Sequence, residues 1–295
     1  MNGILCLDKP ADMTSFRCCA ILRRLLGEKK IGHAGTLDPG ATGVLPLLVG
    51  RGTKALDRLP VHDKSYTATL QFGAVSDTLD IWGEVRQTGA PDPTRAAVEA
   101  ALPTFRGAIQ QVPPMTSALK KDGVRLYDLA RQGIDIPREP RAVTIYQLDC
   151  LAYDEASGLL TLHCCCSKGT YIRTLCDDLG RLLGCGAVMT SLRRTMAAGF
   201  TLEDCLTLEQ AEELAAAGQL ETALIPLEKA LSAYACVTVT APQATRFCNG
   251  GALALERLHN LPQPCTEFVR VYAPDGRFIG LGVPREGELK INCLF

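Results

Sequence analysis

One acidic side chain stands in an unusually constrained stretch of the sequence. Asp38 lies within "KIGHAGTLDPGATGVLPLLVG", residues 30–50, among glycines and prolines. Glycine permits positive φ and close backbone approach, whereas proline fixes φ and removes a donor, so this loop has an imposed shape. A carboxylate held in such a loop can act as a nucleophile or as a general base. The same residue types also suit a tight connection whose aspartate caps the next turn, and composition leaves both interpretations open.

Composition limits the classes of protein to consider. The chain has 295 residues, 47% of them hydrophobic, which favours two domains, or one large domain with an appendage, around a substantial core. The net charge of −1 does not indicate a nucleic-acid binder by bulk electrostatics. A site for a polyanion must therefore be local.

The cysteines and the N-terminus predict a cytoplasmic protein. Fourteen cysteines are present, but "MNGILCLDKPADMTSF" lacks a basic region followed by a long apolar run, so a secreted disulfide protein is not expected. The cysteines form no C-x-x-C pair, and we expect no metal site. We expect a soluble protein without membrane contact, because no apolar run reaches membrane-spanning length. A monomer is the default expectation, since no obligate interface signature is present.

Hydrophobic periodicity predicts the elements that carry the Asp38 loop. "GILCLDKP" predicts a short strand, and a helix follows from apolar residues at helical spacing, namely Cys18, Ile21, Leu22, Leu25 and Leu26. Thr14 or Ser15 caps that helix and Gly27 ends it. Further strands are predicted for "KSYTATLQFG", "VTIYQLDCLAYD" and "GLLTLHCCCSKG". Further helices are predicted for "APDPTRAAVEAAL", "TYIRTLCDDLGRLLG" and "TLEQAEELAAAG". A short helix is also predicted to begin at about Leu126.

The last part of the chain has a different hydrophobic pattern, which is typical of strands. "ACVTVTAPQ", "EFVRVYAPDGRFIGLGV" and "ELKINCLF" predict strands, with a hairpin turn at residues 274–276. These patterns predict two domains, residues 1–230 and a small β domain at residues 231–295.

A glycine-rich motif at residues 50–55 invites a different interpretation. Gly50 to Ala55 match G-x-G-x-x-A after an apolar segment, as in dinucleotide-binding folds. We expect Pro46 to interrupt the preceding strand and Pro60 to end the following helix early. The remaining sequence does not alternate strands with crossover helices, which argues against that fold.

Several motifs in order resemble the bacterial tRNA pseudouridine synthase B family. They are "GHAGTLDPGATGVLPLLVGRGTK", "KSYTATLQFG", "PPMTSALKKDGVRLYDLAR" and "CSKGTYIRTLCDDLG", and the match runs from "GILCLDKP" to "SLRR". The resemblance implies an α+β catalytic domain on a central, mainly antiparallel sheet with flanking helices, followed by a small PUA-like β domain that assists RNA binding. It implies conversion of uridine 55 in the T loop of tRNA to pseudouridine, without a cofactor or metal.

The resemblance also implies roles for individual residues. Asp38 corresponds to the catalytic aspartate, Tyr66 to the tyrosine that stacks on the target base and Arg173 to the arginine that pairs with the aspartate. His33 corresponds to a histidine associated with base flipping. The family usually carries an aromatic residue where this sequence has Thr116, which leaves one packing or base-side contact undefined.

The implied chemistry leaves the intermediate open. Asp38 can attack C1′, act as a base at C2′ or, alternatively, add at C6 of the base. Arg173 would favour the ionised carboxylate through charge-assisted hydrogen bonds. "VSDTLDIWGEV" resembles an Asp-rich family segment in which Asp80 positions the RNA or a loop, or simply forms a turn.

Basic side chains are the candidate contacts to tRNA phosphates, each of them also suited to a solvated surface. Lys64, Lys120 and Arg125 are the principal substrate-binding candidates, and the full set adds Arg17, Lys29, Lys30, Lys54, Lys121, Arg193 and Arg194. Two other functions fit parts of the pattern. The first is a non-catalytic RNA-binding or tRNA-folding protein, and the second is a small-molecule nucleotide enzyme that uses the glycine-rich loop.

Overall fold

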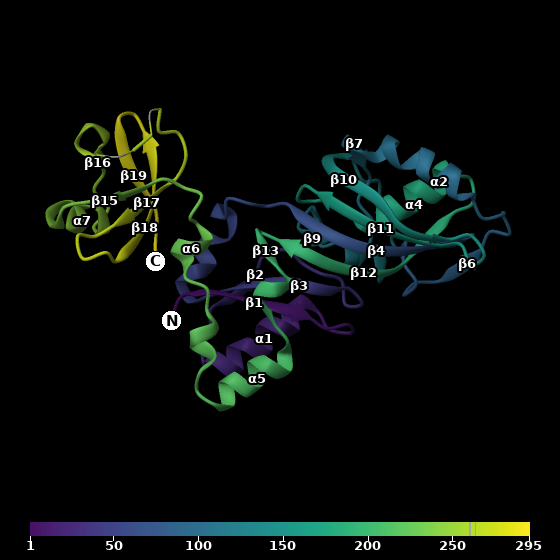
Figure 1. Cartoon of the computed structure of the whole chain (residues 1–295), viewed down its shortest axis with the longest axis horizontal. Coiled ribbons are helices and arrows are strands. Elements are labelled where there is room, and N and C mark those ends of the chain that lie inside the picture. Colours follow the sequence, from purple (N-terminus) through teal and green to yellow (C-terminus); the bar gives the residue numbers. More distant parts are fainter. Residues whose placement is uncertain (260, 263) are drawn as a thin grey trace. The chain divides into compact units, whose positions relative to one another are not determined.

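The chain folds into two units, and each draws on separate stretches of sequence (Figure 1). The structure is a computed structural model that describes residues 1–259, 261–262 and 264–295. The first unit comprises Met1–Leu37, Leu45–Val61 and Ala198–Phe295, and the second comprises Asp38–Val44 and His62–Ala197. Within the part of the chain that is described, no helix has both the length and the apolar character that a membrane crossing requires.

An antiparallel sheet forms the frame of the second unit, as predicted (Figure 1). Its strands lie in the order β12 (Ala187–Ala197), β4 (Lys64–Phe72), β11 (Leu159–Cys166), β10 (Arg141–Asp154) and β7 (Gly107–Gln111). Every second side chain of β4 is buried from Tyr66 onward, in agreement with the period-two pattern. The sequence analysis missed β12, because the polar run at residues 190–195 hides its alternation.

Helix α4 (Ile172–Leu182) packs on this sheet against β12 and β4. Ile172, Leu175, Cys176 and Leu179 form its buried apolar stripe, which fixes the rotation of the helix. Gln111 of β7 holds the start of the helix, since its Oε1 accepts from the Tyr171 N–H (3.0 Å) and its Nε2 donates to the Tyr171 carbonyl (3.3 Å). The first turn of α4, which contains Arg173, is therefore tied to the sheet.

The remaining elements of the second unit are short. They are β5 (Ala74–Ser76), β6 (Val85–Gln87), α2 (Arg95–Ala101), the 3-10 helix η2 (Leu102–Phe105), β8 (Lys120–Lys121), β9 (Val124–Arg125) and α3 (Leu126–Ala130). The structure confirms the helices predicted at α2 and α3. β5 pairs with β6, and β8 pairs with β9, so each pair forms an antiparallel hairpin.

In the first unit, β1 (Gly3–Lys9) lies between β14 (Cys205–Leu206) and β3 (Thr42–Val49), and β2 (Ile31–His33) pairs with the second half of β3. The helices α1 (Ser15–Leu26) and α5 (Leu208–Ala216) pack their apolar faces into one core with these strands. Other elements are η1 (Gly50–Arg58), β13 (Phe200–Thr201), η3 (Leu202–Asp204), η4 (Leu220–Ala223) and α6 (Leu227–Ala230).

Thr14 and Ser15 make different hydrogen bonds at the start of α1. The Thr14 side chain is the cap, because its oxygen accepts from the Arg17 N–H (3.1 Å). The Ser15 hydroxyl instead accepts from the Leu37 N–H (2.9 Å) and donates to the Leu37 carbonyl (3.1 Å). These two bonds fix the backbone immediately before Asp38.

The C-terminal residues of the first unit form a sheet with its own core. Its order is β15 (Cys236–Thr238), β17 (Val269–Tyr272), β18 (Phe278–Arg285), β19 (Glu288–Leu294) and β16 (Leu253–Ala254), with α7 (Ala241–Cys248) and η5 (Leu255–Arg257) beside it. The predicted strand "ACVTVTAPQ" is wrong in its second half, because Thr240 caps α7 and the chain turns helical. The division of the chain near residue 230 stays a prediction.

One expectation around the glycine-rich motif needs correction. Pro46 does not interrupt the strand, since β3 runs through it and its carbonyl accepts from the Ala34 N–H (2.9 Å). The strand loses only the N–H that proline lacks. The motif itself begins η1, a 3-10 helix, and not the α-helix that a dinucleotide site requires.

Gly43 of β3 lies opposite Arg194 of β12 and generates a prediction. It has φ +102°, and an added Cβ would lie 2.1 Å from the Arg194 carbonyl oxygen. Gly133 also has a positive φ (+73°), but nothing lies within 4 Å of its Cβ position. Gly133→Ala should lower the free energy of unfolding by about 1 kcal/mol through backbone strain, and Gly43→Ala by roughly 2–5 kcal/mol through strain plus overpacking. Urea denaturation checks this, and equal losses would contradict it.

Candidate active site

Asp38 lies at the start of a tight turn and remains open to solvent. Its carbonyl accepts from the Ala41 N–H (3.1 Å), which closes the turn through Pro39 and Gly40. The Asp38 side chain is 33% exposed. The turn thus presents one accessible carboxylate on a backbone that proline and the upstream Leu37 bonds restrain.

Arg173 holds both oxygens of that carboxylate. Its Nε lies 3.0 Å from Asp38 Oδ2 and its Nη2 lies 3.3 Å from Oδ1, a bidentate arrangement. Arg173 is 5% exposed, so water competes little for the pair. An arginine in the first turn of a helix opposes the helix dipole, and the paired carboxylate offsets that cost.

The remaining donors of Arg173 are also occupied. Nη2 donates to the Thr116 carbonyl (3.0 Å), while Nη1 donates to the Thr78 carbonyl (3.1 Å) and to the Thr116 hydroxyl. Nη1 also lies 3.5 Å from Asp80 Oδ2. A guanidinium has five N–H donors in a fixed plane, so these partners leave it a single orientation.

Thr116, the position at which the sequence departs from the family pattern, contacts Arg173. Where the resemblance implies an aromatic side chain, this chain offers a hydroxyl and a carbonyl that both accept from Arg173. The residue therefore supports Arg173 by hydrogen bonding. Sequence reasoning did not assign this role, because Thr116 and Arg173 lie far apart in the chain.

Asp80 is a buried member of the site, and its contacts exceed those of an ordinary turn residue. Its side chain is 7% exposed and its Oδ1 accepts from the Thr78 hydroxyl (2.6 Å) and the Trp82 N–H (3.1 Å). The intervening Leu79 has φ +65°, a left-handed conformation that is unfavourable for a bulky residue. This conformation lets one short segment direct both the Thr78 carbonyl and the Asp80 carboxylate at Arg173.

Tyr66 lies in a row of residues across three strands. It is opposite Arg194 of β12, and Arg194 is opposite Gly43 of β3, five residues after Asp38. Tyr66 is 5% exposed, and burial raises the pKa of its hydroxyl to about 12, although the neighbouring Arg194 guanidinium opposes this rise. At neutral pH the hydroxyl is therefore protonated and can donate or accept a hydrogen bond.

Arg194 corrects one expectation about the basic residues. It is fully buried, and its Nε donates to the Val44 carbonyl (2.7 Å), so it does not belong to a phosphate-binding surface. Half-buried Lys64, at the start of β4, has its pKa lowered by burial and by Arg194. The buried charge of Arg194 thus affects both Tyr66 and Lys64.

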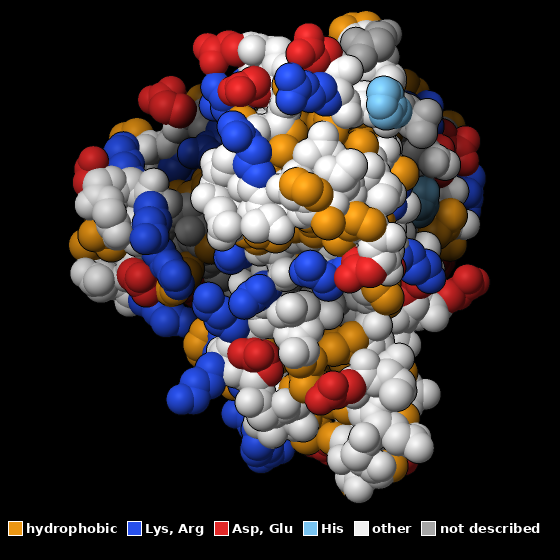
Figure 2. Space-filling model, turned by 90° about the vertical axis from the view of Figure 1, so that its left-hand side faces the viewer, with side chains coloured by type: hydrophobic (Ala, Val, Ile, Leu, Met, Phe, Trp, Pro, Cys, Tyr) orange, Lys and Arg blue, Asp and Glu red, His pale blue; other side chains and the backbone are white. Residues whose placement is uncertain are grey.

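Lys120 and Arg125 face each other in the β8–β9 hairpin and are exposed, as is Lys121. On the face of the molecule in Figure 2, Lys and Arg side chains gather in groups beside apolar surface, consistent with local positive charge on a chain of net charge −1.

His33 belongs to the first unit, where it ends β2 opposite Leu47 and is half-buried. Its predicted role stays a prediction.

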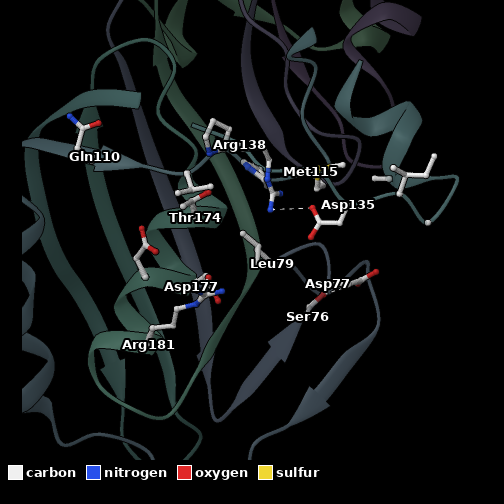
Figure 3. Close-up of a pocket in the computed structure, with 17 residues that line it drawn as sticks. Ser76, Asp77, Leu79, Gln110, Met115, Asp135, Arg138, Thr174, Asp177 and Arg181 are labelled. Atoms are coloured by element: carbon white, nitrogen blue, oxygen red, sulfur yellow. Dashed lines mark hydrogen bonds and ion pairs between the residues drawn. The ribbon is translucent and has the colours of Figure 1, made fainter. Parts of the chain in front are cut away.

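A cavity of about 540 Å³ borders the segments that carry Arg173 and Asp80 (Figure 3). Asp38, Arg173 and Asp80 do not line it, but Thr174 and Leu79, the sequence neighbours of Arg173 and Asp80, do. Ser76, Asp77, Leu79, Met115, Arg138, Thr174, Asp177 and Arg181 belong to the lining. Both arginines in the lining are paired, Arg181 with Asp177 (2.8 Å) and Arg138 with Asp135 (3.4 Å).

Comparison with known families identifies the class of protein. Residues 23–172 match the N-terminal domain of TruB family pseudouridylate synthases. Residues 173–232 match the tRNA pseudouridylate synthase B C-terminal domain, and residues 235–294 match the C-terminal domain of pseudouridine synthase II TruB. The fold is thus that of a pseudouridine synthase. The chain belongs to the TruB family.

Individual relatives agree with this assignment. The tRNA pseudouridine synthase B of Dechloromonas aromatica strain RCB is 46% identical over 289 residues, which are 98% of this chain and 93% of that protein. That of Clostridium perfringens strain ATCC 13124 is 42% identical over 296 residues, 100% and 99% of the two chains. A solved structure described as a Cbf5-Nop10-Gar1 complex has a similar fold, with a TM-score of 0.76 and 24% identity over 99% of this chain and 84% of that one.

The contacts of Asp80 predict a purely catalytic defect when its charge is removed. Asp80→Asn should lower kcat for pseudouridine formation about 10- to 100-fold, because a misplaced Arg173 misplaces Asp38. KM should change little, since Asp80 is buried. The matched control is Asp77→Asn, whose Oδ1 accepts from the Glu84 N–H and which is exposed. Steady-state kinetics measure both variants, and a raised KM with an intact kcat would contradict the prediction.

The raised pKa of Tyr66 predicts a pH-dependent stability. Between pH 10 and 12 the unfolded chain loses this proton while the folded protein keeps it, so the free energy of unfolding should fall as pH rises. The contribution is fully present below pH 10 and amounts to about 3 kcal/mol. Tyr66→Phe should show a shallower decline in urea denaturation above pH 10, with a constant difference from the native protein between pH 7 and 9. Parallel declines above pH 10 would exclude this explanation.

Proposed function

We propose that this chain isomerises uridine 55 in the T loop of tRNA to pseudouridine. The observation that carries the proposal is the solvent-accessible carboxylate of Asp38, held at both oxygens by a buried arginine. Membership of the TruB family supports the reaction class. The relatives named tRNA pseudouridine synthase B support tRNA as the substrate.

The reaction breaks the N1–C1′ bond of uridine and forms a C5–C1′ bond. The proton on C5 leaves to solvent and N1 takes one up, so nothing is oxidised and the atoms balance without a cofactor or metal. Asp38 acts at the ribose, either as a nucleophile on C1′ or as a base at C2′. Arg173 keeps the carboxylate ionised and oriented through its bidentate contact.

The residues around the pair complete the mechanism. Tyr66, neutral at working pH, stacks on the detached base and offers its hydroxyl for the removal of the C5 proton. The target uridine must leave its stack to reach Asp38, and His33 supports this flipping step, which costs a few kcal/mol.

RNA recognition rests on local positive charge and on shape. Lys120, Lys121 and Arg125 of the exposed β8–β9 hairpin, together with Lys64, contact phosphates of the T arm, and binding should weaken with salt. The C-terminal sheet acts as a PUA-like RNA-binding domain of residues 231–295, and residues 1–230 form the catalytic domain. The protein acts as a cytoplasmic monomer on the folded T arm.

Tritium release tests the proposal directly. Unmodified tRNA labelled with [5-³H]uridine should release tritium with the native protein and not with Asp38→Asn, and mapping should place the pseudouridine at position 55. Asp77→Asn is the control for an aspartate substitution outside the Asp38–Arg173 contact. Absence of release from a folded native protein that binds tRNA would refute the catalytic proposal, whereas release that maps elsewhere would refute the position.

A further inference from the structure

Trp82 is the single tryptophan of the chain and is 48% exposed. It follows Asp80 in the loop between β5 and β6, and its neighbour Ile81 is also exposed (44%). Neither side chain has a part in the mechanism described above. Two large apolar groups that face solvent beside the site call for a physical explanation, because burial of their surface would otherwise stabilise the fold.

The indole of Trp82 lies directly on the Asp38 turn. A Cβ added to Gly40 would lie 2.1 Å from its Cζ2 and 2.3 Å from its Cε2. Gly40 does not have a positive φ, so the turn needs glycine here for close approach and not for backbone freedom. The ring occupies the space that any other residue at position 40 would fill.

The backbone of Trp82 is fixed as well. Its N–H donates to Asp80 Oδ1 (3.1 Å), and the Ile81 N–H donates to the Met189 carbonyl of β12 (3.0 Å). The ring and the main chain are therefore held at two points, which leaves the uncovered part of the indole with little freedom. A preorganised aromatic surface loses little entropy when a ligand stacks on it.

We propose that Trp82 is a substrate-binding residue on which a base of the RNA, next to the reacting uridine, stacks. Gly40 is two residues from Asp38, a chain distance of at most about 7 Å, which is within the reach of a neighbouring nucleotide when the ribose of the target is at Asp38. Base–aromatic stacking tolerates any base, so this contact supplies affinity and not sequence recognition. The inference rests on the proposed function, because it takes the T arm of tRNA as the ligand.

Quenching by acrylamide tests this contact in a protein that keeps its tryptophan. All tryptophan emission comes from Trp82, so Asp38→Asn can be titrated with an unmodified T-arm stem-loop RNA without turnover. The half-exposed ring should be accessible to acrylamide in the free protein, and the Stern–Volmer constant should fall several-fold when RNA saturates the protein. An unchanged constant at saturation would overturn the proposal.

Substitutions separate stacking from simple support of the turn. In the Asp38→Asn background, Trp82→Phe should keep the Kd for the RNA within about three-fold, whereas Trp82→Leu, which retains apolar bulk over Gly40, should raise it on the order of ten-fold. Ile81→Ala is the control for an exposed apolar neighbour and should leave the Kd within about two-fold. Equal affinities for the Phe and Leu variants would assign Trp82 a structural role only.

These outcomes are distinguishable from failure of the proposed function. If the native protein neither binds the RNA nor releases tritium, the proposed function fails. If it releases tritium while acrylamide quenching and the Leu variant show no effect, only the role of Trp82 fails. Circular dichroism of each variant establishes that it is folded.

Discussion

The site depends on one geometric constraint, the fixed plane of the Arg173 guanidinium. Its five donors meet partners from three other segments, the Asp38 turn, the β5–β6 loop and the stretch at Thr116. Because a guanidinium cannot bend to serve partners out of its plane, the segments must arrive in register with one another. The position of the Asp38 carboxylate therefore depends on the packing of α4, which carries the arginine.

The sheet of the second unit contains another buried cation. Arg194 is fully buried in β12 and lies beside the Tyr66 hydroxyl, while its backbone leaves room for no side chain at Gly43. Burying a charge is costly unless it is well bonded, so β12 and β3 must stay closely paired. The close strand pairing that positions the end of the Asp38 turn thus also keeps Tyr66 next to a positive charge.

The regular elements were largely predictable from sequence, because periodicity reports burial directly. β4 and α4 follow their patterns closely, and Gly and Pro marked the Asp38 turn. The sequence predicts Arg194 at the surface because a charged residue is normally exposed, and the polar residues of β12 hide that strand for the same reason. The pairing of Arg173 with Asp38 came from a resemblance, and the convergence of Asp80 and Thr116 on Arg173 had no local signal. Such contacts arise only from tertiary packing, which spacing along a chain does not encode.

The route of the chain has a consequence for dissecting the protein. The second unit contains Arg173, Asp80 and Tyr66 within His62–Ala197, but it obtains Asp38 from the separate segment Asp38–Val44. That segment is a brief excursion from strands β2 and β3, whose other residues belong to the first unit. A fragment of residues 62–197 would keep the antiparallel sheet and Arg173, the partner of Asp38, and yet lack Asp38 itself. Recombination between relatives that exchanges residues 62–197 would likewise transfer the partners without the carboxylate.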